Sequence, residues 1–191
     1  MEGFLPEILA TRRMFLYAYD EEWAPEVRDF LERNRAYFQR RETAHAPDYY
    51  EVSQIAGRMQ AARRQMADGN GVTYYGCLKE RPGRIVLNVL LTTAEVEGVR
   101  FGSLGYRMDQ AHTGQGLMTE ALNRLIALGF EMLQYDFIEA IIARDNPASQ
   151  RVAEKLGFVR LSAPDLMLEA GGQLTPHARH RRYPDTVFTP L

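Results

Sequence analysis

Thr113-Gly114-Gln115-Gly116-Leu117-Met118-Thr119 is the stretch that decides the fold of this chain. It follows a strand-like alternation over residues 99–108 and opens an amphipathic helical pattern over residues 114–133. Glycine adopts dihedral angles that other residues avoid, and the first turn of a helix offers unpaired N–H groups at the positive end of its dipole. The order strand, glycine turn, helix therefore predicts a phosphate site built from main-chain N–H groups.

A second polar motif follows the next strand pattern, residues 137–143, and runs from Asn146-Pro147-Ala148-Ser149 to Leu156-Gly157-Phe158. The Asn146 amide can pair with an amide-rich ligand arm, and Ser149 lies one turn further along the same helix face. The alternative is that Asn146 only caps the helix and that Ser149 faces solvent. A diphosphate turn followed by this helix start indicates coenzyme A and acyl transfer.

Composition excludes several classes of protein. The 191 residues fit one domain, residues 1–191, and 46% hydrophobic residues can bury a full core. The net charge of −2 gives no global attraction to nucleic acid or membrane, and no apolar window is long enough for a membrane span. One cysteine and an acidic N-terminus without an apolar signal region indicate a cytoplasmic protein. We expect no metal and no direct nucleic-acid partner, and a monomer or homodimer.

The rest of the pattern predicts alternating strands and helices in a sheet of mixed direction. The expected strands are residues 13–17, 72–79, 85–93, 99–108 and 137–143, with weaker signals at 159–161 or 166–168 and at 183–188. The expected helices are residues 20–34, 50–66, 114–133 and 146–156. Short turns join the three strands between residues 72 and 108, so these are expected to be antiparallel. Residues 40–50 and the basic run 177–182 are interpreted as loops, and Cys77 as a structural thiol.

In order and spacing, five motifs resemble the GNAT superfamily of N-acetyltransferases, and within it the RimJ/RimL branch that acetylates the N-terminal alanine of ribosomal proteins. They are Gly105-Tyr106-Arg107-Met108, the turn at 113–118, Thr119-Glu120-Ala121-Leu122, Asn146 to Arg151, and Glu154 to Phe158. The resemblance implies an α/β (α+β) fold. It has a mixed, mostly antiparallel sheet of six to seven strands, flanked by about four helices and splayed between its fourth and fifth strands.

The resemblance also implies acetyl-CoA as co-substrate and direct attack by a neutral amine. The cofactor-binding residues implied are Tyr106, Met108, Thr113, Gly114, Gln115, Gly116, Leu117, Met118, Thr119, Asn146 and Ser149. A main-chain N–H near Tyr106 to Met108 is expected to stabilise the oxyanion.

The sequence departs from the family pattern at catalytic positions. The tyrosine that often protonates the leaving thiolate falls at Ala153, so Ser149 is the candidate for that role. The glutamate common before the Gly-Tyr pair falls at Ser103. For the base, Glu42, Glu95 and Glu97 stay open, with Glu42 preferred because an acidic residue is usual there.

The sequence leaves three functions open. The first is acetylation of a protein N-terminus, for example of a ribosomal protein. The second is acetylation of a small amine such as an amino acid, polyamine or drug. The third is an acyl-CoA-binding module without turnover, suggested by the departures at Ala153 and Ser103.

Overall fold

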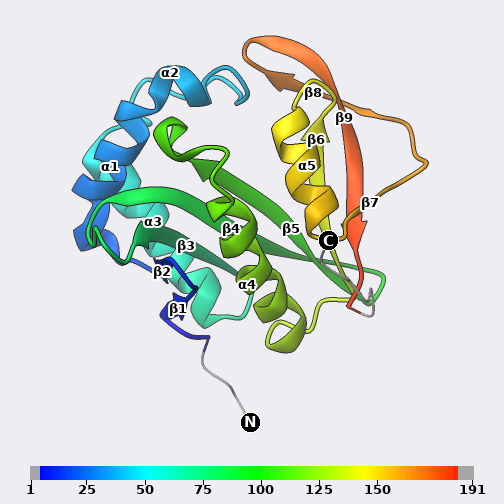
Figure 1. Ribbon diagram of the computed structural model, residues 1–191, viewed down its shortest axis with the longest axis horizontal. Helices are drawn as coiled ribbons and strands as arrows, with labels where there is room; N and C mark the ends of the chain where they lie inside the picture. The colour runs from blue at the N-terminus through cyan, green and yellow to red at the C-terminus, as the bar shows by residue number, and fades with distance from the viewer. Residues whose placement is uncertain (1–4, 185–191) are drawn as a thin grey trace.

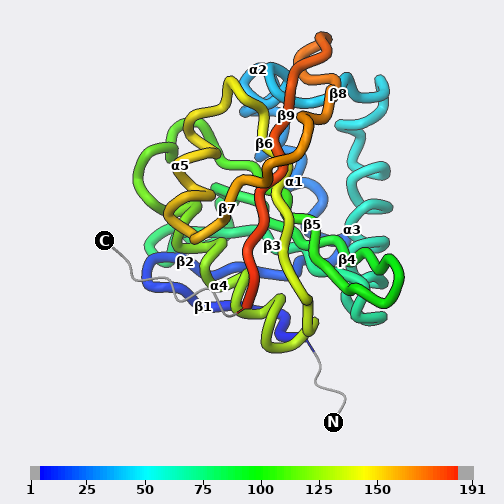
Figure 2. The backbone as a smooth tube through the Cα atoms, turned by 90° about the vertical axis from the view of Figure 1, so that its right-hand side faces the viewer, coloured from blue at the N-terminus to red at the C-terminus, as the bar shows by residue number. Residues whose placement is uncertain are grey.

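The computed structural model describes residues 5–184 as a twisted sheet covered by helices on both faces (Figures 1 and 2). Its strands are β1 (Ile8–Ala10), β2 (Met14–Tyr17), β3 (Gly71–Leu78), β4 (Ile85–Val96), β5 (Val99–Met108), β6 (Phe137–Ala143), β7 (Val159–Arg160), β8 (Leu166–Ala170) and β9 (Gln173–Arg182). Its helices are α1 (Ala24–Arg33), α2 (Arg35–Phe38), α3 (Val52–Ala67), α4 (Leu117–Glu131) and α5 (Pro147–Lys155), with 3₁₀ turns at Glu21–Trp23 and Gln110–His112.

Within the described residues the sheet order is β1-β2-β3-β4-β5-β6-β9-β7, with β8 pairing β9. Every pair is antiparallel except β5 with β6. The predicted mixed, mostly antiparallel sheet is confirmed, and residues 5–184 form nine strands and five α-helices where six to seven and about four were expected.

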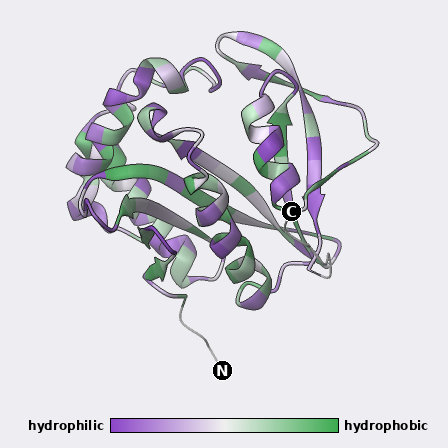
Figure 3. Ribbon diagram, viewed as in Figure 1, coloured by the Kyte–Doolittle hydropathy of each residue, from purple (hydrophilic) through white to green (hydrophobic). Residues whose placement is uncertain are grey.

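Two hydrophobic clusters hold the layers together. Helices α1 and α3 bury Val27, Phe30, Ile55 and Met59 against β3 and β4 on one face. Helix α4 lays its apolar stripe, including Leu122, on the opposite face, where α5 also packs against β6 (Figure 2). Figure 3 shows the same division, with the hydrophobic colour of the helices turned toward the sheet. Burial of these stripes is the main stabilising contribution, at about 25 cal/mol per Å² of apolar surface.

The sheet opens between β5 and β6. These parallel strands pair only over Phe101–Ser103 and Phe137–Glu139, and β5 continues to Met108 beside β4 alone. Because Asp109 donates its N–H to the Val86 carbonyl at 2.8 Å, the alternation of an antiparallel pair turns the N–H groups of Tyr106 and Met108 away from β4. Both therefore face the space where β6 has diverged, as the predicted splay requires.

The C-terminal part of the chain differs most from the sequence prediction. Residues 159–160 and 166–170 both form strands, although only one of the two was expected. At the other end of the chain, strand β1 was not predicted. The basic run 177–182 was wrongly interpreted as a loop, since it forms most of β9 in the interior of the sheet. The predicted strand at 183–188 has no strand at residues 183–184, and its remainder lies outside the described residues.

Burial of β9 is possible because two of its three arginines are compensated by one carboxylate. Glu139 on β6 is buried and accepts hydrogen bonds from Arg179 at 3.0 and 3.2 Å and from Arg181 at 2.8 Å. His177 and His180 are buried and direct ring nitrogens to backbone carbonyls of their own strand. A buried carboxylate with two guanidiniums avoids the cost of an unpaired charge.

Candidate active site

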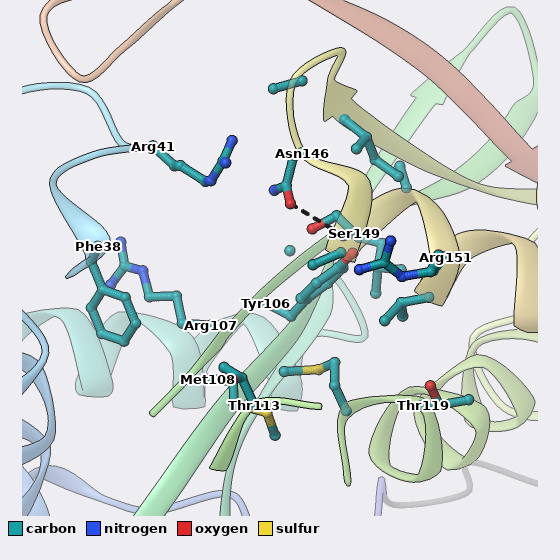
Figure 4. A pocket seen from close by; sticks show the side chains of 18 of the residues that line it. Phe38, Arg41, Tyr106, Arg107, Met108, Thr113, Thr119, Asn146, Ser149 and Arg151 are labelled. Carbon is teal, nitrogen blue, oxygen red and sulfur yellow. Dashed lines mark hydrogen bonds between the residues drawn. The ribbon is translucent and has the colours of Figure 1, made fainter. Parts of the chain in front are cut away.

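A cavity of about 510 Å³ lies where β5 and β6 separate, and it extends between the starts of α4 and α5 toward the loop after α2. Figure 4 shows its layout, with Thr119 and Arg151 at one end, Phe38, Arg41 and Arg107 at the other, and Tyr106 and Ser149 between them. The cavity is thus a passage with two different ends, which suits a site that must receive two substrates.

The glycine turn forms one wall of this cavity. Gly114 and Gly116 both have φ of +76°, a left-handed conformation that costs other residues about 1–2 kcal/mol. Gly116 is the N-cap of α4 and provides no side-chain cap, so the N–H groups of the first helical turn stay available for an anion. The turn therefore has the shape and the polarity that a diphosphate needs.

Two contacts from α1 hold the approach to this turn. Arg33 donates to the buried Asp109 carboxylate at 2.8 Å, and Gln110 donates its N–H to the Asn34 side chain at 3.0 Å. Burial alone would raise the pKa of Asp109, but hydrogen bonds from Arg33 and Ala111 lower it overall. Asp109 is therefore an anion that fixes the start of the 3₁₀ turn before Thr113.

The second motif forms the opposite wall. Asn146 accepts the Ser149 N–H at 3.2 Å and so caps α5, as the alternative interpretation expected, while both residues also line the cavity. The Tyr106 hydroxyl points at Ser149 from β5, close enough for the serine side chain to interact with it (Figure 4). Burial raises the pKa of Tyr106, and the Ser149 side chain offsets part of that rise. Tyr106 is therefore a neutral phenol across the physiological pH range.

Glu42 lies at the other end of the cavity, and both of its oxygens are paired. Oε1 lies 2.5 Å from Arg107 Nε, and Oε2 lies 2.8 Å from His45 Nε2. Burial would lower the pKa of Arg107, but Glu42 and Tyr49 raise it overall. Glu95 lies near the end of β4 and Glu97 in the turn that follows it, and neither lines the cavity.

Most of the predicted site residues lie together. Nine of the eleven cofactor-binding predictions line this cavity, as does Glu42, whereas Gln115 faces solvent and Leu117 is buried in the core. The sequence prediction missed other lining residues, among them the aromatic and basic side chains of Tyr37, Phe38, Arg41, Arg107, Arg151, Lys155 and His177. Arg151 and Lys155 are four residues apart on the α5 motif, a spacing that places them on one helix face and could have indicated them.

A second cavity of about 460 Å³ adjoins the first between the loop after α2 and the β8–β9 hairpin. Arg41 and Ala143 line both cavities. The Arg41 guanidinium reaches across to Asp145, with 3.1 Å to the carboxylate and 3.1 Å to the carbonyl oxygen. This exposed ion pair marks the boundary between the two cavities.

Comparison with known proteins identifies the family of the chain. The model of the acetyltransferase (GNAT) domain family matches residues 13–159, which is most of the chain and includes every residue that lines the first cavity except His177. The chain belongs to the GNAT acetyltransferase family. This GNAT enzyme is an acetyl-CoA-dependent N-acetyltransferase, so the module without turnover is set aside.

A probable N-acetyltransferase of Bacillus subtilis, YjcK, is 30% identical to the GNAT enzyme over 125 residues, 65% of this chain and 68% of the relative. Among solved structures, the ribosomal-protein-S5-alanine acetyltransferase of Vibrio fischeri superposes with a TM-score of 0.87 at 18% identity, covering 95% of this chain and 99% of that one. Mycobacterium smegmatis RimJ in complex with CoA-disulfide gives 0.86 at 18% identity, covering 100% and 93%. At these identities the structures establish the shared fold.

Neither a membrane-spanning helix nor a metal cluster occurs within residues 5–184. No helix in this range is long and apolar enough to cross a membrane. No three His, Cys, Asp or Glu side chains gather there closely enough to hold a metal ion.

Proposed function

We propose that this enzyme acetylates the α-amine at the N-terminus of a protein, with a ribosomal protein as the first substrate to test. The observation that carries the proposal is the second cavity, which adjoins the first and shares the lining residues Arg41 and Ala143 with it. An acceptor residue that enters the first cavity from this side has space behind it for the residues that follow. A small amine would leave that space unused.

The lining of the second cavity suits a peptide of varied sequence. It combines polar side chains, including Gln39, Gln173 and Thr175, with the backbone of Ala170 and Gly171. Gly171 donates its N–H to the Glu42 carbonyl at 3.0 Å, so the hairpin and the loop after α2 form one continuous wall. Such a wall offers hydrogen bonds to a peptide backbone without selecting one side chain.

The ionisation of the acceptor favours an α-amine over a lysine. An α-amino group with a pKa of about 8 is roughly one quarter neutral at pH 7.5, whereas lysine with a pKa of about 10.4 is neutral about once in a thousand. Both Glu42 oxygens are paired, one with Arg107 and one with His45, at the end of the cavity left for the acceptor. We propose that Glu42 attracts the amine and accepts its proton. An α-amine needs little of this help, because about a quarter of it is already neutral at pH 7.5.

The remaining chemistry follows from the two walls. The N–H groups of Tyr106 and Met108, turned away from β4, are proposed to donate to the oxyanion that forms when the amine attacks the acetyl carbonyl. Ser149 is proposed to pass a proton to the thiolate as it leaves, with the Tyr106 phenol behind it as a hydrogen-bonding partner. The proton that Glu42 takes from the amine returns through solvent and restores the Ser149 hydroxyl. Collapse of the intermediate then breaks the C–S bond and releases the acetylated amine and coenzyme A.

The neighbouring structures support the same acceptor. The Vibrio fischeri protein is a ribosomal-protein-S5-alanine acetyltransferase, and RimL is a ribosomal L7/L12 α-N-protein acetyltransferase with a TM-score of 0.81. Arg151 and Thr119 lie at the end of the cavity beside the phosphate turn, so the acceptor is left with the end at Phe38 and Arg41.

The test compares three acceptors at equal concentration by following release of free thiol from acetyl-CoA. They are a peptide that begins with alanine or serine, the same peptide with a blocked N-terminus and an internal lysine, and a panel of small amines. We expect turnover only with the free N-terminus, and mass spectrometry should place the acetyl group there. Turnover confined to the small amines would refute the proposal.

A further inference from the structure

The Arg13 side chain reaches the phosphate turn from a distant part of the chain. Arg13 precedes β2, and its own carbonyl accepts the Lys79 N–H at 2.9 Å, which ties its backbone to the end of β3. Its guanidinium donates through Nη1 to the Gln115 carbonyl at 3.0 Å. The place where a Cβ on Gly116 would sit is 3.6 Å from Nη2. Arg13 thus lies behind the turn, while the cavity lies in front of it.

The contact with the Gln115 carbonyl fixes a peptide plane. In a trans peptide the C=O of one residue and the N–H of the next point in opposite directions. A carbonyl of Gln115 held toward Arg13 therefore directs the N–H of Gly116 to the other side, toward the cavity that Gly116 lines. With Gly116 in the left-handed conformation, this N–H joins those of the first turn of α4 in one concave array.

Glu120 keeps Arg13 in this orientation. Its Oε2 accepts from Arg13 Nε at 2.8 Å and its Oε1 accepts the Arg13 N–H at 2.7 Å, so one carboxylate holds both ends of the arginine. Burial alone would raise the pKa of Glu120, but hydrogen bonds from Thr11 and Arg13 lower it overall. Glu120 is therefore an anion at neutral pH and does not release the guanidinium.

We infer that Arg13 is a positioning residue for the donor's diphosphate, which holds the turn at Gln115–Gly116 in its anion-binding shape before the substrate arrives. The inference rests on the proposed phosphate site at Gly114–Gly116. Preorganisation of this kind lowers the cost of binding, because the turn needs no rearrangement when the donor enters. The role requires a planar guanidinium, because its separate N–H groups donate to Glu120 and to Gln115 at the same time. The single ammonium of lysine does not reach both acceptors.

The experiment uses two donors that differ at the diphosphate. Acetyl-CoA carries the diphosphate and the nucleotide, whereas acetyl-pantetheine carries the same thioester without them. For Arg13→Gln we expect the KM for acetyl-CoA to rise about tenfold or more, with kcat and the KM for acetyl-pantetheine unchanged. Arg13→Lys should show the same selective loss. Arg12→Gln is the matched control, since Arg12 is the adjacent, exposed arginine, and it should change neither donor.

Three results would overturn the role of Arg13: equal losses for both donors, an unchanged KM for acetyl-CoA, or normal behaviour of Arg13→Lys. If Arg13→Gln does not fold, Glu120→Gln keeps the arginine but removes the charge and one of the two oxygens that hold it, and a selective loss for acetyl-CoA is again required. A wild-type enzyme that uses acetyl-pantetheine as well as acetyl-CoA would instead contradict the phosphate site itself.

Discussion

Removing one oxygen atom tests the proposed route of the proton to the thiolate. Tyr106→Phe deletes the hydroxyl that points at Ser149 and leaves the ring in place. If Ser149 donates the proton directly, Ser149→Ala should lower kcat about 100-fold, which corresponds to about 2.7 kcal/mol of transition-state stabilisation. If Tyr106 acts only through Ser149, Tyr106→Phe should lower kcat about tenfold.

The double variant shows whether the hydroxyls of Tyr106 and Ser149 act together or independently. It should be no slower than Ser149→Ala alone, which gives a coupling energy of about 1.4 kcal/mol between the two hydroxyls. The assay is thiol release at saturating acetyl-CoA and peptide, so that changes in binding do not enter. Additive losses, or a full kcat for Tyr106→Phe, would refute the reasoning.

A matched control exists elsewhere in the fold. Tyr135 also faces a hydroxyl, with 2.6 Å between its oxygen and that of Thr93, but neither residue lines the cavity. Tyr135→Phe and Tyr106→Phe should each cost about 1 kcal/mol of unfolding free energy, because each removes one partly buried hydrogen-bonding group. Only Tyr106→Phe should change kcat.

Three further predictions concern the turn, its support and the acceptor end. Gly116→Ala and Gly98→Ala introduce a side chain at similar φ values of +76° and +79°. The free Gly116→Ala enzyme should relieve this strain by leaving the left-handed turn, and the donor must then restore the turn when it binds. Only Gly116→Ala should therefore raise the Kd for acetyl-CoA in calorimetry, by about 5- to 30-fold, the equivalent of about 1–2 kcal/mol of strain. Asp109→Asn should cost about 3 kcal/mol at neutral pH in denaturant titrations. The folded protein lowers the pKa of Asp109, so the ionised carboxylate stabilises the fold at any pH above the ordinary pKa of an aspartate. This stabilisation is lost as the pH falls through the pKa of the folded protein, and the difference between Asp109→Asn and wild type should therefore shrink below about pH 4. Glu42→Gln should lower kcat/KM for the peptide about tenfold or more without changing the Kd for acetyl-CoA, and an unaltered kcat/KM would remove Glu42 from the mechanism.

The local motifs predicted the parts of the site that depend on neighbouring residues. Gly114 and Gly116 carry the dihedral preference of the turn in their own identity, and Asn146 and Ser149 share one turn of one helix. Such features can be read from spacing because the physics involved spans only a few residues.

The parts that failed depend on partners far along the chain. The run 177–182 looked like a solvated loop because the carboxylate that neutralises its arginines, Glu139, lies some forty residues earlier. Arg13 likewise donates a hydrogen bond to the carbonyl of Gln115, 102 positions away in the sequence, and no local pattern predicts that contact. Arg41 reached the cavity only because the loop after α2 folds over it. Long-range pairing of charges is the information that composition and periodicity lack.

The single cysteine gives this enzyme an internal reporter. Cys77 is 1% exposed and contacts the Tyr19 hydroxyl beneath α1 and α3, so a thiol reagent can reach it only when the fold opens. The rate of Cys77 labelling therefore measures opening without an engineered probe. Acetyl-CoA has no free thiol, so its protection of Cys77 would measure donor affinity for every variant in an identical assay.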